Sequence, residues 1–192
     1  SAIFLSFLIF ASTSLLFIYG SENRHDLPAW KAVRDNDFIF GQFLWTGIDY
    51  LGESGRWSSR GSQPGLLDFG GFRKPLGWWR ASLWSDKPMA YLGSYPISSR
   101  NHNGTNRRDD NGAPSIYAED SWNYDAGQTV RVVCYTNQPQ ARLLLNGKIV
   151  GETKQKDDET GIIYWDIPYG SGTLLGEALD KNGKVASTYQ LQ

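Results

Sequence analysis

The stretch 128–137, QTVRVVCYTN, decides the fold of the C-terminal part of the chain. Apolar and polar residues alternate along it, which is typical of a strand with one buried face. Similar short strands follow in ARLLLNGKIVGE (141–152), GIIYWDIPY (161–169) and GTLLGEALDKNGKVASTYQL (172–191). Asn146-Gly147 and Asn182-Gly183 are strong signals for two-residue hairpin turns. About seven short strands predict an immunoglobulin-like β-sandwich over residues 115–192.

The composition excludes several classes of site. Cys134 is the single cysteine and lies in a predicted strand, so it is interpreted as a packed core residue. The chain has two histidines, which makes a histidine-based metal site improbable, and no metal or other cofactor is expected. The net charge is −1, with acidic and basic residues interspersed, so nothing indicates a nucleic-acid partner.

The first 18 residues, SAIFLSFLIFASTSLLFI, carry no charged side chain. That length suits the apolar region of a signal sequence or an anchor, and equally a segment buried in a larger fold. Residues 1–17 are therefore an apolar segment with both interpretations open, and so is membrane association. The first interpretation implies a secreted or periplasmic protein.

Residues 18–97 read as alternating strands and helices. A strand ending at Gly20 is followed by a predicted helix over 27–37, with Pro28 in its first turn, and by a strand centred on residues 42–45. This order is the βαβ pattern of a parallel sheet. A long glycine-rich loop (52–77) and a further helix (77–86) follow. The polar stretch 98–114 predicts a linker between two domains.

Polar chemistry gathers just after the first of these strands. Glu22 and His25 follow Gly20, and Trp45 ends the next predicted strand. The carboxyl ends of neighbouring parallel strands meet at one rim, where α/β barrels carry their catalytic groups. A carboxylate, an imidazole and an aromatic ring at one rim suit sugar chemistry, because they can attack an anomeric carbon, hold a hydroxyl and stack on a sugar ring.

The stretches GSENRH, AWKAVRDNDFIFGQFLWTGIDYLGE and GLLDFGGFRKPLGWWRASLWSDKP resemble the end of the catalytic barrel of glycoside hydrolase family 2. The match is to its bacterial β-galactosidase-like members. VVCYTNQPQARLLLNGKIVG resembles the immunoglobulin-like domain that follows the barrel in many of them. The resemblance implies an α/β plus all-β chain: the last two βα units of a (β/α)8 barrel (18–97), the linker (98–114) and the sandwich (115–192).

The resemblance also implies roles for individual residues. Glu22 matches the family's nucleophile, which forms a glycosyl-enzyme intermediate, and His25 matches a contact to a sugar hydroxyl. Trp45 matches the tryptophan that lines the sugar subsite. Asp49 and Tyr50 belong to the same motif, as part of the wall or as supporting residues. The implied reaction is the cleavage of terminal β-galactoside-type bonds.

One departure from the family pattern matters more than these matches. A retaining glycosidase needs two carboxyl groups roughly 5 Å apart, and the family's acid/base is a glutamate preceded by asparagine. No Asn-Glu pair occurs in this sequence, and Glu53, the other carboxylate in the predicted rim loop, is interpreted as structural. We expect a fragment that is inactive alone and needs the remainder of the barrel as its partner.

Two other interpretations stay open. The chain could be a non-catalytic carbohydrate-binding or structural module, with the sandwich as its folded unit, or residues 1–18 could anchor a surface-exposed β-domain. For the first alternative, a sugar-binding face has four candidates, although core packing is the favoured role for them: Trp122, Tyr124, Trp165 and Tyr169. The sequence does not distinguish galactosides from glucuronides or mannosides.

Overall fold

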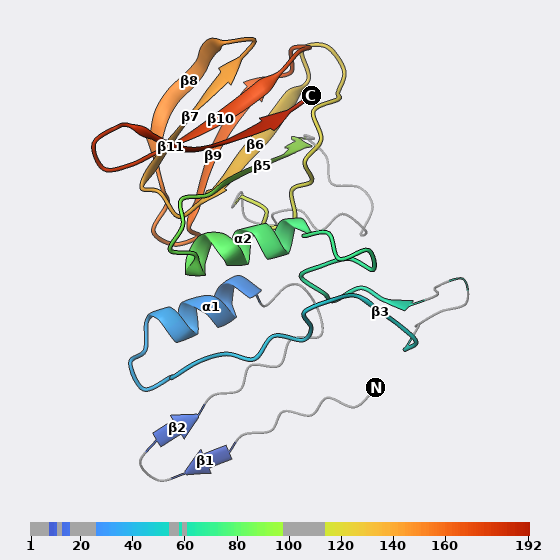
Figure 1. The fold of residues 1–192 in the computed structure, drawn as a ribbon, viewed down its shortest axis with the longest axis vertical. Coiled ribbons are helices and arrows are strands. Elements are labelled where there is room, and N and C mark those ends of the chain that lie inside the picture. The colour runs from blue at the N-terminus through green and yellow to red at the C-terminus, as the bar shows by residue number, and fades with distance from the viewer. Residues whose placement is uncertain (1–7, 11–12, 16–25, 54–57, 59–60, 98–113) are drawn as a thin grey trace. The chain divides into compact units, whose positions relative to one another are not determined.

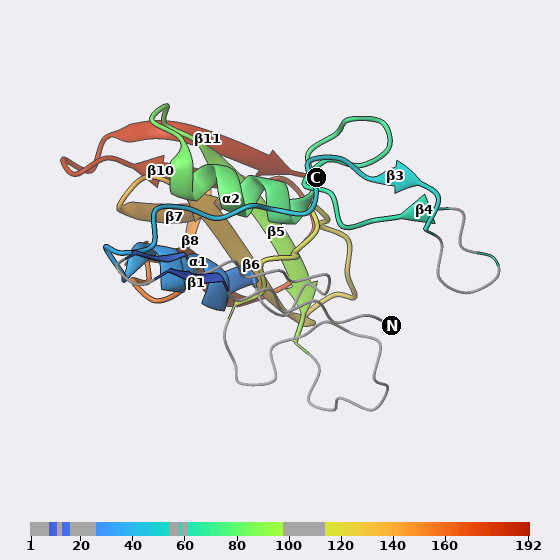
Figure 2. The same cartoon turned by 90° about the horizontal axis from the view of Figure 1, so that it is seen from below.

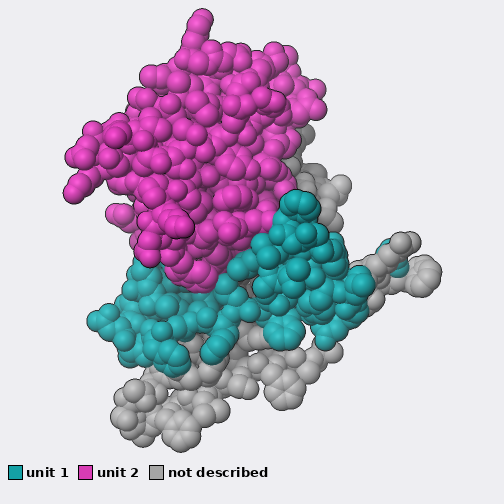
Figure 3. Space-filling model, in the orientation of Figure 1, with its two compact units in different colours: residues 1–72 teal, residues 73–192 magenta. Residues whose placement is uncertain are grey.

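The computed structural model describes residues 8–10, 13–15, 26–53, 58, 61–97 and 114–192. The chain divides into two compact units, residues 1–72 and 73–192, each of which is described by itself (Figure 3). The first unit contains β1 (Leu8–Phe10), β2 (Thr13–Leu15), α1 (Asp26–Arg34), β3 (Tyr50–Leu51) and β4 (Gly61–Ser62). The second contains α2 (Pro75–Trp84), β5 (Ala90–Pro96), β6 (Thr129–Thr136), β7 (Gln140–Leu145), β8 (Lys148–Gln155), β9 (Ile162–Pro168), β10 (Leu174–Leu179) and β11 (Val185–Leu191).

The second unit is a β-sandwich. Its described strands form a three-stranded sheet in the order β5-β6-β9 and a four-stranded sheet in the order β11-β10-β7-β8 (Figure 1). All neighbouring strands within these sheets are antiparallel. The expected sandwich is therefore confirmed, but one of its seven strands, β5, lies before the expected bounds 115–192.

Alternating residues of both sheets meet in one apolar core. Along β6, every second side chain points inward, as the pattern in QTVRVVCYTN predicts. Burying each large aliphatic or aromatic side chain contributes roughly 1.5–3 kcal/mol to folding. The buried core residues are Leu92, Trp122, Val130, Val132, Cys134, Ala141, Leu143, Ile163, Trp165, Ile167, Leu174 and Leu191.

Two hairpins of the sandwich close in different ways. Asn146 and Gly147 both have positive φ, 50° and 77°, and join β7 to β8 in the expected two-residue turn. The expectation for Asn182-Gly183 is wrong, because a longer loop joins β10 to β11. There the Asp180 carboxylate accepts the backbone N–H groups of Asn182 (2.8 Å) and Lys184 (2.9 Å), and of the turn pair only Gly183 has positive φ.

Helix α2 packs on the outer face of the three-stranded sheet. Pro75 stands in the first turn, where its missing N–H has no helical partner to lose. Trp78 stacks on Tyr91 of β5, and Tyr91 stacks on Tyr135 of β6, with ring centroids 5.4 Å apart in each pair. The helix expected over 77–86 is thus confirmed, and it is part of the same compact unit as the sandwich.

Strand β5 lies on the N-terminal side of the expected linker. It pairs with β6 residue by residue, from Ala90 opposite Thr136 to Pro96 opposite Val130. One sheet of the sandwich therefore includes residues that the sequence interpretation assigns to the barrel region, 18–97. Residues 98–113 of the expected linker lie outside the described residues, so the linker itself stays a prediction.

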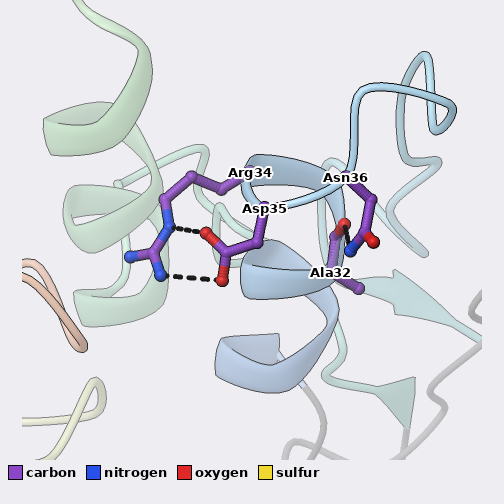
Figure 4. Close-up of polar contacts among 4 residues, drawn as sticks. All are labelled: Ala32, Arg34, Asp35 and Asn36. Atoms are coloured by element: carbon purple, nitrogen blue, oxygen red, sulfur yellow. Dashed lines mark hydrogen bonds and ion pairs between the residues drawn. The ribbon is translucent and has the colours of Figure 1, made fainter.

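Helix α1 is the helix of the first unit among its described residues. The helix is the one expected over 27–37, and its last turn is fastened by side chains (Figure 4). The Asn36 side-chain amide donates to the Ala32 carbonyl at 2.8 Å, and Arg34 Nη2 donates to Asp35 Oδ2 at 2.9 Å. Asn36 thus satisfies one of the carbonyls at the end of the helix, where helical N–H donors run out.

The structure does not confirm the partial barrel. The expected strand at 42–45 is wrong, because those residues form no strand. The described strands of this unit form two short antiparallel hairpins, β1–β2 and β3–β4, and Figure 2 shows the second of them. A strand depends on the hydrogen bonds of its neighbours, and no parallel neighbour for 42–45 lies among the described residues.

Candidate functional site

The residues proposed from the sequence divide into two groups. Glu22 and His25 lie outside the described residues, so their placement stays a prediction. Trp45 is described, and so are Asp49, Tyr50 and Glu53 of the same motif. The candidate site is therefore built from the segment 45–53 and the loop that holds it.

The Trp45 indole is accessible and oriented by a neighbour. Its side chain is 54% exposed, and Nε1–H donates to the Tyr50 hydroxyl oxygen at 3.3 Å. The two rings meet edge to face, with centroids 6.3 Å apart and an interplanar angle of 90°. The Trp45–Thr46 peptide bond is cis. An exposed indole fixed at its nitrogen can offer a ring face to an apolar surface such as that of a sugar.

Tyr50 also forms a hydrogen bond to the carboxylate of Glu53. Its hydroxyl donates to Glu53 Oε2 at 2.6 Å while accepting the Trp45 N–H. Gly52 and Glu53 have φ of 93° and 44°, and these two left-handed residues turn the chain so that Glu53 reaches Tyr50. The geometry agrees with the structural interpretation of Glu53.

Asp49 anchors the segment to the loop that follows β4. Asp49 is 6% exposed. Its carboxylate accepts the Gly65 N–H at 2.7 Å, while its backbone N–H donates to the Leu67 carbonyl at 2.9 Å. Leu67 N–H donates to Gly47 O at 3.0 Å. The segments around Asp49 and Gly65 approach so closely that a Cβ on Gly65 would stand 2.3 Å from the Asp49 nitrogen. Asp49 therefore holds the segment 45–53 in place through hydrogen bonds to residues 65–67.

The Tyr50–Glu53 contact is a feature that the sequence interpretation missed. The signal was present in DYLGE, where a glycine precedes Glu53 and allows the chain to fold back over three residues. Nothing in the residue pattern, however, identifies Trp45 as the group whose N–H meets the Tyr50 hydroxyl. That contact depends on the course of residues 46–49, which long-range bonds to residues 65–67 determine.

The aromatic residues of the sandwich do not form an exposed sugar face. Trp122 and Trp165 are each 2% exposed, and their indole N–H groups donate to the carbonyls of Gly170 (3.1 Å) and Glu152 (2.8 Å). Tyr124 and Tyr169 pack against the core cluster and against Trp122. The favoured interpretation, core packing, is confirmed for these residues.

Burial also determines the chemistry of Cys134. The side chain is fully buried, and desolvation raises the pKa of its thiol to about 12. The reactive thiolate is therefore disfavoured at neutral pH, which agrees with a packing role. Among the described residues, no three His, Cys, Asp or Glu side chains gather closely enough to hold a metal ion. None of the helices described here has the length and apolar character needed to cross a membrane.

Comparison with known proteins connects both units to one group of enzymes. Residues 127–187 match a domain of unknown function, DUF4982. The chain is 33% identical over 172 residues to β-galactosidase BoGH2A of Bacteroides ovatus, covering 88% of this chain and 17% of that protein. It is 30% identical over 171 residues to a putative β-glucuronidase of Formosa agariphila, covering 82% and 13%. The chain thus spans less than a fifth of the length of either relative.

Solved structures give the same result. A family 2 glycosyl hydrolase from Bacteroides cellulosilyticus superposes with a TM-score of 0.68 at 26% identity, covering 93% of this chain and 25% of that one. A β-glycosidase from Bacteroides vulgatus gives 0.66 at 26% identity, covering 87% and 18%. In sequence and in structure, the chain matches a C-terminal portion of the enzymes of glycoside hydrolase family 2.

Proposed function

We propose that the chain supplies part of the active site of a retaining glycoside hydrolase that cleaves terminal β-galactoside-type bonds. Glu22 is the nucleophile, His25 holds a sugar hydroxyl, and Trp45 lines the sugar subsite. The observation that carries the proposal is the Trp45 indole, which is exposed yet fixed at its nitrogen by Tyr50. The galactoside is preferred because BoGH2A, a β-galactosidase, is a relative over most of this chain.

The chain alone is expected to be inactive. Retaining hydrolysis needs a second carboxyl group as acid/base, and Glu53 is unsuited to that role because it already accepts the Tyr50 hydroxyl. We therefore assign the acid/base to the remainder of a catalytic barrel, which is the proposed partner.

Exposed apolar side chains on the first unit support that partner. Contact of apolar side chains with water is unfavourable, and the remainder of a barrel would cover such side chains. Apart from Trp45, the exposed large apolar side chains among the described residues of the unit are Phe38, Phe40, Phe43, Ile48, Leu51, Phe69 and Phe72.

A chimera tests the proposal. The matching 172 residues of BoGH2A are replaced by this chain, so that BoGH2A supplies the remainder of the protein. We expect the chimera to hydrolyse p-nitrophenyl β-galactoside, the isolated chain to show no turnover, and Glu22→Gln to lower kcat by about a thousandfold or more. Asp37→Asn, which changes an exposed carboxylate of the same unit, is the control. Full activity of Glu22→Gln would overturn the assignment.

If the isolated chain bound galactose saturably and the chimera showed no turnover, the alternative of a carbohydrate-binding module would be favoured. The burial of Trp122 and Trp165 argues against a sugar face on the sandwich built from them.

A further inference from the structure

We infer that Tyr50 and Glu53 are positioning residues that set the orientation of the Trp45 ring for sugar binding. The inference rests on the proposed function, because Trp45 is the proposed platform. It adds two residues that touch no sugar themselves and act through the indole.

The hydrogen bonds run in one direction from the ring to the carboxylate. Trp45 Nε1–H can only donate, and it donates to the Tyr50 hydroxyl oxygen at 3.3 Å. The Tyr50 hydroxyl has one proton, with which it donates a hydrogen bond to Glu53 Oε2 at 2.6 Å. Because that proton points at Glu53, the lone pairs of the Tyr50 oxygen stay directed at the indole. Glu53 therefore selects the hydroxyl orientation that holds Trp45.

The two hydrogen bonds Trp45–Tyr50–Glu53 form a relay, and the backbone beside this relay is held by other contacts. Residues 46–49 are fastened to residues 65–67 by backbone hydrogen bonds of 2.9–3.1 Å, and Tyr50 pairs with Ser62 across β3 and β4. The remaining freedom is the rotation of the exposed indole about its side-chain bonds. The hydrogen bond from Nε1 to the Tyr50 hydroxyl, together with the edge-to-face contact between the two rings, restrains that rotation.

A purely structural role would have a different consequence. If the Tyr50–Glu53 bond served only to close the turn at Gly52, its loss would loosen the turn and leave the indole environment unchanged. If the relay orients Trp45, the loss of either partner changes the environment of the indole N–H, and only an oriented ring presents a constant face to a sugar.

The first test is spectroscopic and needs no sugar. In ¹⁵N–¹H correlation spectra of the 192-residue chain, Trp45→Phe identifies the Trp45 indole signal. Tyr50→Phe and Glu53→Ala are expected to move this signal in the same direction and to leave the other indole signals in place. Glu53→Gln, which keeps an acceptor oxygen, is expected to move it less, and Asp37→Asn not at all. An unmoved Trp45 signal in both Tyr50→Phe and Glu53→Ala would overturn the inference.

The second test uses the BoGH2A chimera and p-nitrophenyl β-galactoside. Tyr50→Phe and Glu53→Ala are expected to raise KM several-fold with little change in kcat, because a platform binds ground state and transition state alike. Glu53→Gln should restore most of the loss. An unchanged KM beside a shifted indole signal would overturn the positioning role. An inactive unsubstituted chimera would instead contradict the proposed function, while the spectra still decide whether the relay orients the ring.

Discussion

Trp79 of α2 donates its indole N–H to the carbonyl oxygen of Thr160 at 3.2 Å, from a fully buried position. Thr160 lies just before β9, so this bond ties the helix to the end of the three-stranded sheet. The tie is one reason why α2 belongs to the same compact unit as the sandwich.

Replacing Trp79 should therefore destabilise that unit. We expect Trp79→Ala to lower the free energy of unfolding by about 3–5 kcal/mol, because it removes a buried ring and leaves a cavity. Trp84→Ala removes an exposed ring from the same helix and should cost less than about 1 kcal/mol. Urea unfolding followed by circular dichroism measures both, and equal losses would contradict the packing described for α2.

Gly65→Ala should disturb the support of the candidate site. The added Cβ would stand 2.3 Å from the Asp49 nitrogen and 2.5 Å from the Leu67 oxygen, so residues 46–49 and 65–67 must separate. We expect at least about tenfold faster hydrogen exchange at the Asp49 and Leu67 amides. Gly41→Ala is the matched control, because a Cβ there meets nothing within 4 Å. Unchanged protection at both amides in Gly65→Ala would show that the contact is not needed.

The burial of Cys134 predicts that the free energy of unfolding depends on pH. Burial raises the pKa of its thiol from 9.0 to about 12 in the folded state. The unfolded thiol therefore loses its proton first, and stability that is complete below pH 9 is lost as the pH rises towards 12. Linkage gives a fall of about 1 kcal/mol between pH 9 and 10. Cys134→Ala should be less stable at neutral pH but should lack this part of the slope. Burial also raises the pKa values of Tyr91 and Tyr189, so a smaller slope is expected to remain in the variant. A slope as steep as that of the unsubstituted chain would contradict the assignment.

The sandwich could be predicted because its information is local. Alternation in QTVRVVCYTN and the Asn146-Gly147 turn each predict their own strand or hairpin, and both are confirmed. The Asn182-Gly183 turn differs because Asp180 competes for the backbone N–H groups of the loop. A rule that considers only the two residues of the turn does not include the effect of a side chain that lies before them.

The membership of β5 could not be predicted in the same way. Ala90–Pro96 pairs with a strand about forty positions later in the chain, across the polar stretch 98–114. A compositional boundary marks polar sequence and says nothing of which strands pair across it. The apolar run at 42–45 shows the converse, since an apolar pattern forms a strand only where a neighbour supplies hydrogen bonds.

Trapping the covalent intermediate tests the central claim most directly. The BoGH2A chimera is incubated with a 2-deoxy-2-fluoro-β-galactosyl fluoride and digested, and its peptides are analysed by mass spectrometry. We predict one fluorosugar on the peptide that contains Glu22, and none on that peptide in Glu22→Gln. A label on another carboxylate, or no label while intact BoGH2A is labelled under the same conditions, would contradict the assignment of Glu22 as the nucleophile.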